Sequence, residues 1–456
     1  MRAVTAQWIA NAVGGTLVAD VDIAVTSVEK DSRDVTPGAM YVAFVGERVD
    51  GHQYVDAATA AGAVLSLVSQ PVAAPHILVD DVTEGLGKLA RAYLADLRIR
   101  GDITVVGVTG SNGKTTTKDL LAQVLPDVVA PVGSFNNEIG MPLTVLRADD
   151  TTRHLVLEMG ASGPGHIAYL TQIAPVDIAV VLNVGSAHLG QYASIDDVAQ
   201  AKSELVAGLV PGGIAILNAD DARVAAMAPL APNVATFGVD RGDIRATKLE
   251  LDSGRARFTV RQGAVAVDVP RLSLIGEHHV TNALAAIAVA VHRGLSLDGA
   301  AAAVAQAKAL SEHRMALVDR PDGVTVIDDS YNASPESMRA ALRALLAVAN
   351  GGRTVAVLGE MLEMGDVSVA AHADIGHTVV RLGIDLVLVV GAGARPIFDS
   401  AVREGSWGEE AAYVDTIGEA RDLLDDVLTA GDTVLVKASH GSGLWTLADD
   451  LVGAKR

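Results

Sequence analysis

The chain has 456 residues, of which 50% are apolar, and this length is enough for about two to four domains with sizeable cores. Its 35 Lys and Arg residues against 55 Asp and Glu give a formal net charge of −20, which disfavours binding to the anionic backbone of DNA or RNA. The absence of cysteine excludes disulfides, thiolate metal sites and cysteine nucleophiles.

The N-terminus lacks the apolar segment of a signal peptide. The longest apolar runs, such as 283–291, are much shorter than the ~20 residues that cross a bilayer. A chain without cysteine is also what a reducing cytoplasm permits. We therefore expect a soluble cytoplasmic protein with no membrane partner and no nucleic-acid partner.

Short β-branched runs alternate with Ala/Leu-rich segments of helical period through most of the chain. The clearest runs are 103–108, 154–158, 178–182, 354–358, 386–390 and 433–436. Continuous apolar strands separated by helices indicate parallel sheets covered on both faces, which is the α/β class. Breaks at 98–102 and 311–314 predict three domains: a small N-terminal α/β domain (1–98), a central mononucleotide-binding domain with a parallel sheet (99–312) and a C-terminal Rossmann-like α/β domain (313–456).

A glycine-rich turn joins the run 103–108 to a helical segment at 117–125. In such a P-loop, backbone N–H groups and the helix N-terminus face a phosphate, a lysine adds positive charge and a hydroxyl reaches Mg²⁺. The residues that would do this are Gly110, Ser111, Asn112, Gly113, Lys114, Thr115 and Thr116. The first glycine of the usual pattern is displaced to Gly107, so a turn that binds nothing is the alternative. No Asn-Lys-x-Asp segment supports guanine, and ATP is the predicted nucleotide.

Polar residues follow two further buried runs. Glu158 ends the run 154–158, where a nucleotide-binding fold places a Mg²⁺ ligand, although a solvated strand end can also carry a glutamate. His188 follows the run 178–182 and Lys202 lies in a helical segment. On pattern alone, these two are typical of an ordinary loop histidine and a solvated lysine. His278, in a His-His pair, could belong to a site or to a loop.

Taken together, these segments resemble the Mur ligases, the ATP-dependent amide-forming enzymes of peptidoglycan synthesis. The family's P-loop reads Thr-Gly-x-x-Gly-Lys-Thr with the same displaced glycine, and the resemblance covers essentially the whole chain. The segments 136–144, 182–190, 328–335 and 359–365 are similar to the members that add D-alanyl-D-alanine to UDP-N-acetylmuramoyl-tripeptide. The Asp-Asn-Pro-Arg segment of the diaminopimelate-adding members does not occur in this sequence.

The resemblance implies roles for residues of the central domain. The P-loop would hold the phosphates of ATP, Thr115 and Glu158 would bind one Mg²⁺, and His188 would bind a second. Lys202 matches the family lysine that reacts with CO₂, and its carbamate would help to hold the second metal. The catalytic residues that the resemblance implies are therefore Lys114, Glu158, His188 and Lys202.

Further matches imply binding roles. Asn282 would contact adenine, with His278 nearby. Arg314 would face the γ-phosphate at the hinge between the last two domains, and Asp329 would bind the ribose hydroxyls. The residues implied for the substrate are Ser32 and Arg33, which would grip the UDP-sugar, together with Asn136, Asn137, Asn332 and Ser334.

The implied reaction converts the peptide carboxylate into an acyl phosphate, which the amine of D-alanyl-D-alanine then attacks. The domain 1–98 would bind the UDP-sugar, 99–312 would bind ATP, and 313–456 would bind the dipeptide and part of ATP; closure of the three would exclude water. We expect a monomer. A sibling ligase that adds another amino acid and a non-catalytic ATP-binding switch are the alternatives. The sequence leaves open whether the third peptide residue is diaminopimelate or lysine, and which group takes the proton of the amine.

Overall fold

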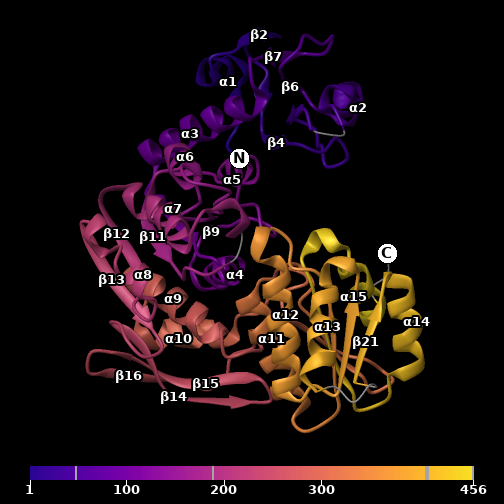
Figure 1. The fold of residues 1–456 in the computed structure, drawn as a ribbon. Coiled ribbons are helices and arrows are strands. Elements are labelled where there is room, and N and C mark those ends of the chain that lie inside the picture. The colour runs from indigo at the N-terminus through magenta and orange to yellow at the C-terminus, as the bar shows by residue number, and fades with distance from the viewer. Residues whose placement is uncertain (47–48, 187–188, 406–409, 454–456) are drawn as a thin grey trace.

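The computed structural model describes residues 1–46, 49–186, 189–405 and 410–453, and most of its strands form three large sheets that follow one another along the chain (Figure 1). Most neighbouring strands in these sheets run parallel, with helices between them. The predicted α/β class is therefore confirmed. Within the described ranges, no helix is both long enough and apolar enough to span a membrane.

The N-terminal part contains a five-stranded sheet of order β2-β7-β6-β5-β4, in which only β2 is antiparallel to its neighbour. Its strands are β2 (Thr16–Val18), β4 (Ser27–Glu29), β5 (Ala39–Val42), β6 (Leu65–Val68) and β7 (His76–Leu78), and β1 (Val4–Thr5) pairs separately with β3 (Ala24–Val25). Its helices are α1 (Ala6–Val13), α2 (Val55–Ala61) and α3 (Val82–Arg100).

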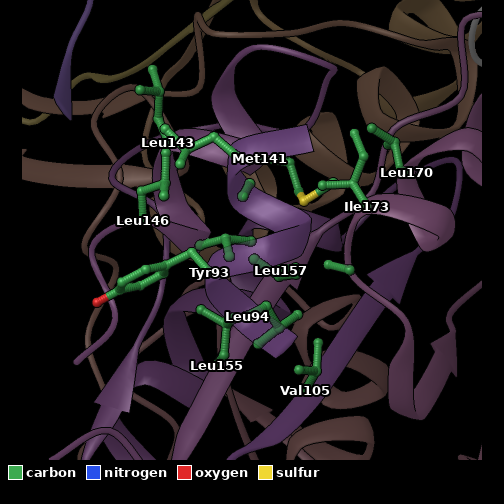
Figure 2. Close-up of a cluster of buried hydrophobic side chains, with 14 of the residues drawn as sticks. Tyr93, Leu94, Val105, Met141, Leu143, Leu146, Leu155, Leu157, Leu170 and Ile173 are labelled. Atoms are coloured by element: carbon green, nitrogen blue, oxygen red, sulfur yellow. The ribbon is translucent and has the colours of Figure 1, made fainter. Parts of the chain in front are cut away.

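Helix α3 connects the N-terminal part to the middle of the molecule. Its Tyr93 and Leu94 pack with Val105, Leu155 and Leu157 of the next sheet (Figure 2). The Tyr93 hydroxyl also donates a hydrogen bond to the backbone oxygen of Ala148, at 2.7 Å. One hydrophobic core therefore runs from the first sheet into the second, so that α3 orients one part against the other.

The middle part contains a nine-stranded sheet of order β16-β15-β14-β13-β12-β11-β8-β10-β9. Its strands are β8 (Thr104–Thr109), β9 (Val128–Val129), β10 (His154–Glu158), β11 (Val176–Val181), β12 (Leu209–Asn218), β13 (Asn233–Gly238), β14 (Ile244–Asp252), β15 (Arg255–Gln262) and β16 (Val265–Val269). Its helices are α4 (Lys114–Val124), α5 (Gly140–Val145), α6 (His166–Ile173), α7 (Ile195–Ala207), α8 (Ala222–Ala225), α9 (His279–His292) and α10 (Leu297–Gln306).

Alternate residues of the central strands enter two different cores. Val105 and Leu155 pack on the α3 side, whereas Val106 and Val156 pack on the side covered by α4 and α9. These strands are apolar at every position because both faces are covered. The strands β14 to β16 differ: β15 and β16 are antiparallel, and outward residues of β14 are exposed. This antiparallel arm was not among the predicted strands.

The C-terminal part contains a six-stranded sheet of order β17-β18-β22-β19-β20-β21, antiparallel only at β17. Its strands are β17 (Ala316–Asp319), β18 (Thr325–Asp328), β19 (Thr354–Leu358), β20 (Leu386–Val390), β21 (Ala411–Val414) and β22 (Thr433–Lys437). Its helices are α11 (Pro335–Ala349), α12 (Ser368–Leu382), α13 (Arg395–Glu404), α14 (Ile417–Val427) and α15 (Trp445–Val452). The same cleft between the two larger sheets is lined by residues after β8, by Glu158 at the end of β10, and by residues after β18 and at or after the end of β22.

Candidate active site

The P-loop lies between the end of β8 and the start of α4. Gly113 has a left-handed φ of +86°, and a Cβ placed on it would lie 2.3 Å from Oδ1 of Asn282, so glycine is required here both by conformation and by space. Because Gly113 at the N-cap has no side chain, the first N–H groups of α4 are left open to an anion. The Lys114 ammonium donates to the backbone oxygen of Gly110 at 2.8 Å, which folds the lysine over the loop.

Asn183, which follows β11, holds the P-loop in shape. Its Oδ1 accepts a hydrogen bond from the Asn112 N–H at 2.9 Å, and its Nδ2 donates to the Asn112 backbone oxygen at 3.1 Å. Ser111 is tied to the same segment, since its hydroxyl accepts from the Gly185 N–H at 2.8 Å. Sequence reasoning gave Asn183 no role, although an amide at the carboxyl end of a buried strand beside a P-loop was a usable signal.

Thr115 and Glu158 meet as predicted at the ends of neighbouring elements. The Thr115 hydroxyl donates to Oε2 of Glu158 at 3.0 Å, and Nδ2 of Asn136 donates to Oε1 of the same carboxylate at 2.9 Å. Glu158 is only 1% exposed. A hydroxyl and a carboxylate held together are hard oxygen ligands of the kind that Mg²⁺ takes. The donor set therefore fits the expected metal.

Lys202 is not the solvated helix lysine that the pattern alone suggested. It lies on α7, is 6% exposed, and forms no hydrogen bond or ion pair with any residue that the structure describes. Burial, together with the nearby Lys114 cation, lowers the pKa of Lys202 to about 7. Burial also lowers the pKa of Lys114, against the attraction of Glu158. His188 lies outside the described residues.

A cavity of about 320 Å³ extends from the P-loop to the C-terminal part and brings together the four predicted nucleotide-binding residues that lie outside the P-loop. They are His278, Asn282, Arg314 and Asp329. Asn282 is 3% exposed, and its Nδ2 lies 3.2 Å from Nδ1 of His279. The Asp329 carboxylate is held by the buried ammonium of Lys437, which also donates to the Asn332 backbone oxygen at 2.9 Å. Lys437 was missed, although it ends an apolar strand as Glu158 does.

Arg314 reaches from the C-terminal part into the phosphate site. Its Nη2 donates to the hydroxyls of Thr115, at 3.3 Å, and Ser134, at 3.2 Å. Its guanidinium carbon lies 4.3 Å from the centre of the Tyr331 ring. These groups border a second cavity, of about 280 Å³, that is also lined by the P-loop, Glu158 and residues 439–441. Ser134 and Tyr331 were not predicted as site residues.

The other predicted substrate residues near the cleft make contacts within the protein. The Ser334 hydroxyl caps α11 and donates to Oδ1 of Asn112 at 3.1 Å, so it joins the C-terminal part to the P-loop. Oδ1 of Asn332 accepts from the Ala333 N–H at 2.9 Å. Oδ1 of Asn137 accepts from the Gly140 N–H at 2.9 Å, at the start of α5.

Ser32 and Arg33 line a third cavity, of about 630 Å³, in the N-terminal part. The Arg33 side chain is 86% exposed, and its Nε donates to Oδ1 of Asp31 at 2.9 Å, so it stands at the rim rather than in the core. Lys30, on the same rim, places its ammonium 5.0 Å from the centre of the Phe135 ring. Because Phe135 lies between two residues of the phosphate cavity, Ser134 and Asn136, the two cavities are neighbours.

The site consists of a P-loop, a buried carboxylate beside it and an arginine supplied by a second sheet that faces them. This arrangement defines a nucleotide-dependent enzyme whose site lies between domains. Three family models cover most of the chain: the Mur ligase middle domain matches residues 108–290, the Mur ligase glutamate ligase domain matches 313–440, and the Mur ligase family catalytic domain matches 24–94. The chain belongs to the Mur ligase family.

Individual relatives match this chain over nearly its whole length. The UDP-N-acetylmuramoyl-tripeptide–D-alanyl-D-alanine ligase of Mycobacterium tuberculosis is 44% identical, with 99% of this chain and 98% of that protein covered. The enzyme of the same name from Bacillus subtilis is 34% identical, with 98% of each covered. Among solved structures, MurF from Acinetobacter baumannii matches with a TM-score of 0.89 and 31% identity over 99% of each chain. MurF from Thermotoga maritima in complex with ADP matches with a TM-score of 0.81 and 31% identity, covering 94% of this chain and 97% of that one.

Proposed function

We propose that this chain joins UDP-N-acetylmuramoyl-tripeptide to D-alanyl-D-alanine, using ATP and passing through an acyl phosphate. The observation that carries the proposal is the match, over 98–99% of the chain, to relatives that bear this activity in their names. The site supports the same reaction, since a P-loop and an arginine from the opposite domain converge on one cavity. The ADP complex of the T. maritima relative supports ATP as the nucleotide.

Positive charge at the transferring phosphate is what the first step needs most. A peptide carboxylate is a poor electrophile and repels the polyphosphate that it must attack. The Lys114 ammonium, the Arg314 guanidinium and the open N-terminus of α4 would together offset that repulsion. Thr115 and Glu158 would hold Mg²⁺, which when bound screens the phosphate oxygens and withdraws charge from them.

Lys202 is proposed as the site of a carbamate. A neutral amine attacks CO₂, forms an N–C bond and releases one proton, so an amine that is neutral near pH 7 is required. The pKa of about 7 that burial gives to Lys202 meets that requirement. The product would be an anion at a buried position, which would help to hold a second Mg²⁺ together with His188.

The three cavities suggest how the substrates are distributed. The 630 Å³ cavity in the N-terminal part would take the UDP-sugar at Ser32 and Arg33. The 320 Å³ cavity would take the nucleoside of ATP at Asn282 and Asp329, and residues 439–441 of the C-terminal part would face the incoming dipeptide. Since one chain supplies every part of this site, we propose that it works as a monomer. A reaction that uses ATP favours the cytoplasm.

The test is phosphate release from ATP in the presence of UDP-N-acetylmuramoyl-tripeptide, with and without D-alanyl-D-alanine. We expect release to require both substrates and the pentapeptide product to be seen by mass. Release only with a UDP-muramoyl dipeptide and diaminopimelate would move the chain to a sibling activity. Tight ATP binding with no release for any acceptor would indicate a switch instead.

A further inference from the structure

The crossing from the middle part to the C-terminal part contains two residues in a conformation that side chains rarely adopt. His313 has a φ of +56° and Met315 a φ of +53°, both in the left-handed region, and neither is glycine. Arg314 lies between them. A strained segment persists only where its surroundings hold it, so the contacts on both sides of Arg314 need an explanation.

His313 is tied to the C-terminal part through its ring and its backbone. Its Nδ1 lies 2.7 Å from Oδ2 of Asp328, and its Nε2 lies 3.9 Å from Oδ1 of Asp449. Its backbone oxygen accepts a hydrogen bond from the Tyr331 N–H at 3.2 Å. The other oxygen of Asp328 accepts from Ser330, so both oxygens of this buried carboxylate are engaged by the protein. The cluster is therefore a tether rather than an open cation site.

Met315 is held by Asp329, which follows Asp328 at the end of β18. Its N–H donates to Oδ1 of Asp329 at 3.2 Å. Consecutive aspartates at the end of β18 thus fix the residues on either side of Arg314. The Arg314 guanidinium is held by hydrogen bonds at Nη2 and by the Tyr331 ring, whereas its Nε is buried without a hydrogen-bond partner in the part of the chain that is described.

We infer that His313 is a positioning residue for Arg314. Bonded to Asp328, it holds the hinge in the left-handed conformation that directs the guanidinium across the domain boundary to Thr115 and Ser134. Without the bond between His313 and Asp328 the hinge relaxes, and the Arg314 guanidinium no longer points into the phosphate site. This inference rests on the proposed function, because it takes the group that Arg314 faces to be the γ-phosphate of ATP.

The first experiment measures nucleotide binding and needs no acceptor substrate. In His313→Ala, we expect the affinity for a non-hydrolysable ATP analogue to fall about tenfold while the affinity for ADP is unchanged, because only the γ-phosphate contact is affected. His313→Asn should retain more of the affinity, since asparagine tolerates a positive φ and keeps a short polar side chain. His377→Ala, which removes a histidine paired with Glu404 elsewhere in the same domain, is the matched control. Equal losses for ADP and the analogue would overturn the inference.

The second experiment is a double-mutant cycle with Arg314→Ala, with kcat for pentapeptide synthesis and the thermal unfolding temperature measured for each protein. If His313 acts through Arg314, His313→Ala lowers kcat in the wild-type background and has no further effect on kcat in Arg314→Ala, whereas its effect on unfolding persists. Equal factors in both backgrounds would mean that His313 acts independently. If pentapeptide synthesis is absent from the wild type, the proposed activity fails, while the binding comparison still tests the role of His313.

Discussion

Lys202 is buried and Lys114 is half-buried at the phosphate cavity, and the two ammonium groups differ in chemistry because their surroundings differ. Burial lowers the pKa of both, but the attraction of Glu158 opposes the shift at Lys114, whereas the Lys114 cation adds to the shift at Lys202. Lys114 is therefore suited to remain a cation facing phosphate. Lys202 is suited to react as a neutral amine.

Replacing Lys202 by alanine tests the carbamate directly. We expect Lys202→Ala to lower kcat by about 10²-fold, the scale on which loss of one electrostatic group slows a reaction, with partial rescue by small carboxylic acids. Removal of dissolved CO₂ should lower the turnover of the wild type reversibly and leave the variant unaffected. Lys88→Ala, on the exposed face of α3, is the control. Unaltered turnover in Lys202→Ala would contradict the assignment.

Asn136 and Asn137 are adjacent but have different partners, which provides a matched pair. Asn136 donates to Glu158, so Asn136→Ala should raise the Mg²⁺ concentration for half-maximal turnover by about tenfold, as is usual when a group orienting a metal ligand is lost. Asn137 accepts from the first N–H groups of α5, so Asn137→Ala should lower the free energy of unfolding by about 1 kcal/mol and leave the Mg²⁺ requirement unchanged. Titration of activity with Mg²⁺ checks the Mg²⁺ requirement of both variants. An Mg²⁺ requirement in Asn136→Ala equal to that in Asn137→Ala would refute the role of Asn136.

At the scale of elements, two short 3₁₀ helices bring the middle and C-terminal parts into contact. In η2 (Leu189–Gln191), the Gly190 N–H donates to the backbone oxygen of Glu363 at 3.1 Å, just before η4 (Gly365–Val367). A Cβ on Gly190 would lie 2.7 Å from the backbone nitrogen of Gly365. The contact thus depends on a bare backbone, and a single methyl group would force the two parts away from each other.

Gly190→Ala should therefore weaken the closed arrangement without changing the P-loop. Overpacking of this kind costs about 1–3 kcal/mol, which corresponds to roughly a 5–150-fold change in the population of the two states. We expect kcat to fall while ADP affinity is retained, and small-angle scattering to show a more open molecule. Gly418→Ala, where a new Cβ would be 3.9 Å from its nearest neighbour, is the control. Wild-type kcat in Gly190→Ala would show that this contact is not used in turnover.

At the scale of the whole molecule, the site exists only while the parts are docked. The P-loop and α11 are joined through Ser334 and Asn112, and Glu336 accepts hydrogen bonds from the Ser186 N–H, at 3.2 Å, and hydroxyl, at 2.8 Å. A docked site protects an acyl phosphate from water, but it must open again to exchange substrates. Turnover therefore requires the contact to form and to break.

A short thiol cross-linker between Ser186→Cys and Glu336→Cys should hold the molecule closed. We expect multiple turnover to stop and nucleotide bound beforehand to stay bound, measured by product formation and by nucleotide release. Each single cysteine variant treated in the same way is the control, and the native chain contains no other thiol to compete. Full turnover in the cross-linked protein would mean that this interface need not open.

Local sequence patterns predicted the α/β class, the P-loop and the strand-end carboxylate of Glu158, because each is encoded in a few consecutive residues. The same method missed Lys437, whose partner Asp329 is 108 residues distant, and Ser134, whose partners come from two domains. It also took Lys202 for a solvated residue, since burial of a helix face depends on what packs against it. That Thr115 and Glu158 would share one Mg²⁺ was implied by the resemblance to the family. Pairings of distant segments carry no signal in a single sequence.

The antiparallel arm of β14 to β16 has at one end a turn, between β14 and β15, that lies beside both the segment 276–278 and α11. At this turn, the Gly254 backbone oxygen accepts from the Gly276 N–H at 2.7 Å, two residues before His278, and a Cβ on Gly254 would lie 2.8 Å from Val348 of α11. The turn therefore touches both the segment that would meet adenine and the helix that moves with the C-terminal part. Because the chain has no native thiol, a single dye can be attached at Ser253→Cys. Its fluorescence would report, in real time and in single molecules, whether the nucleotide enters the cavity before or after α11 docks.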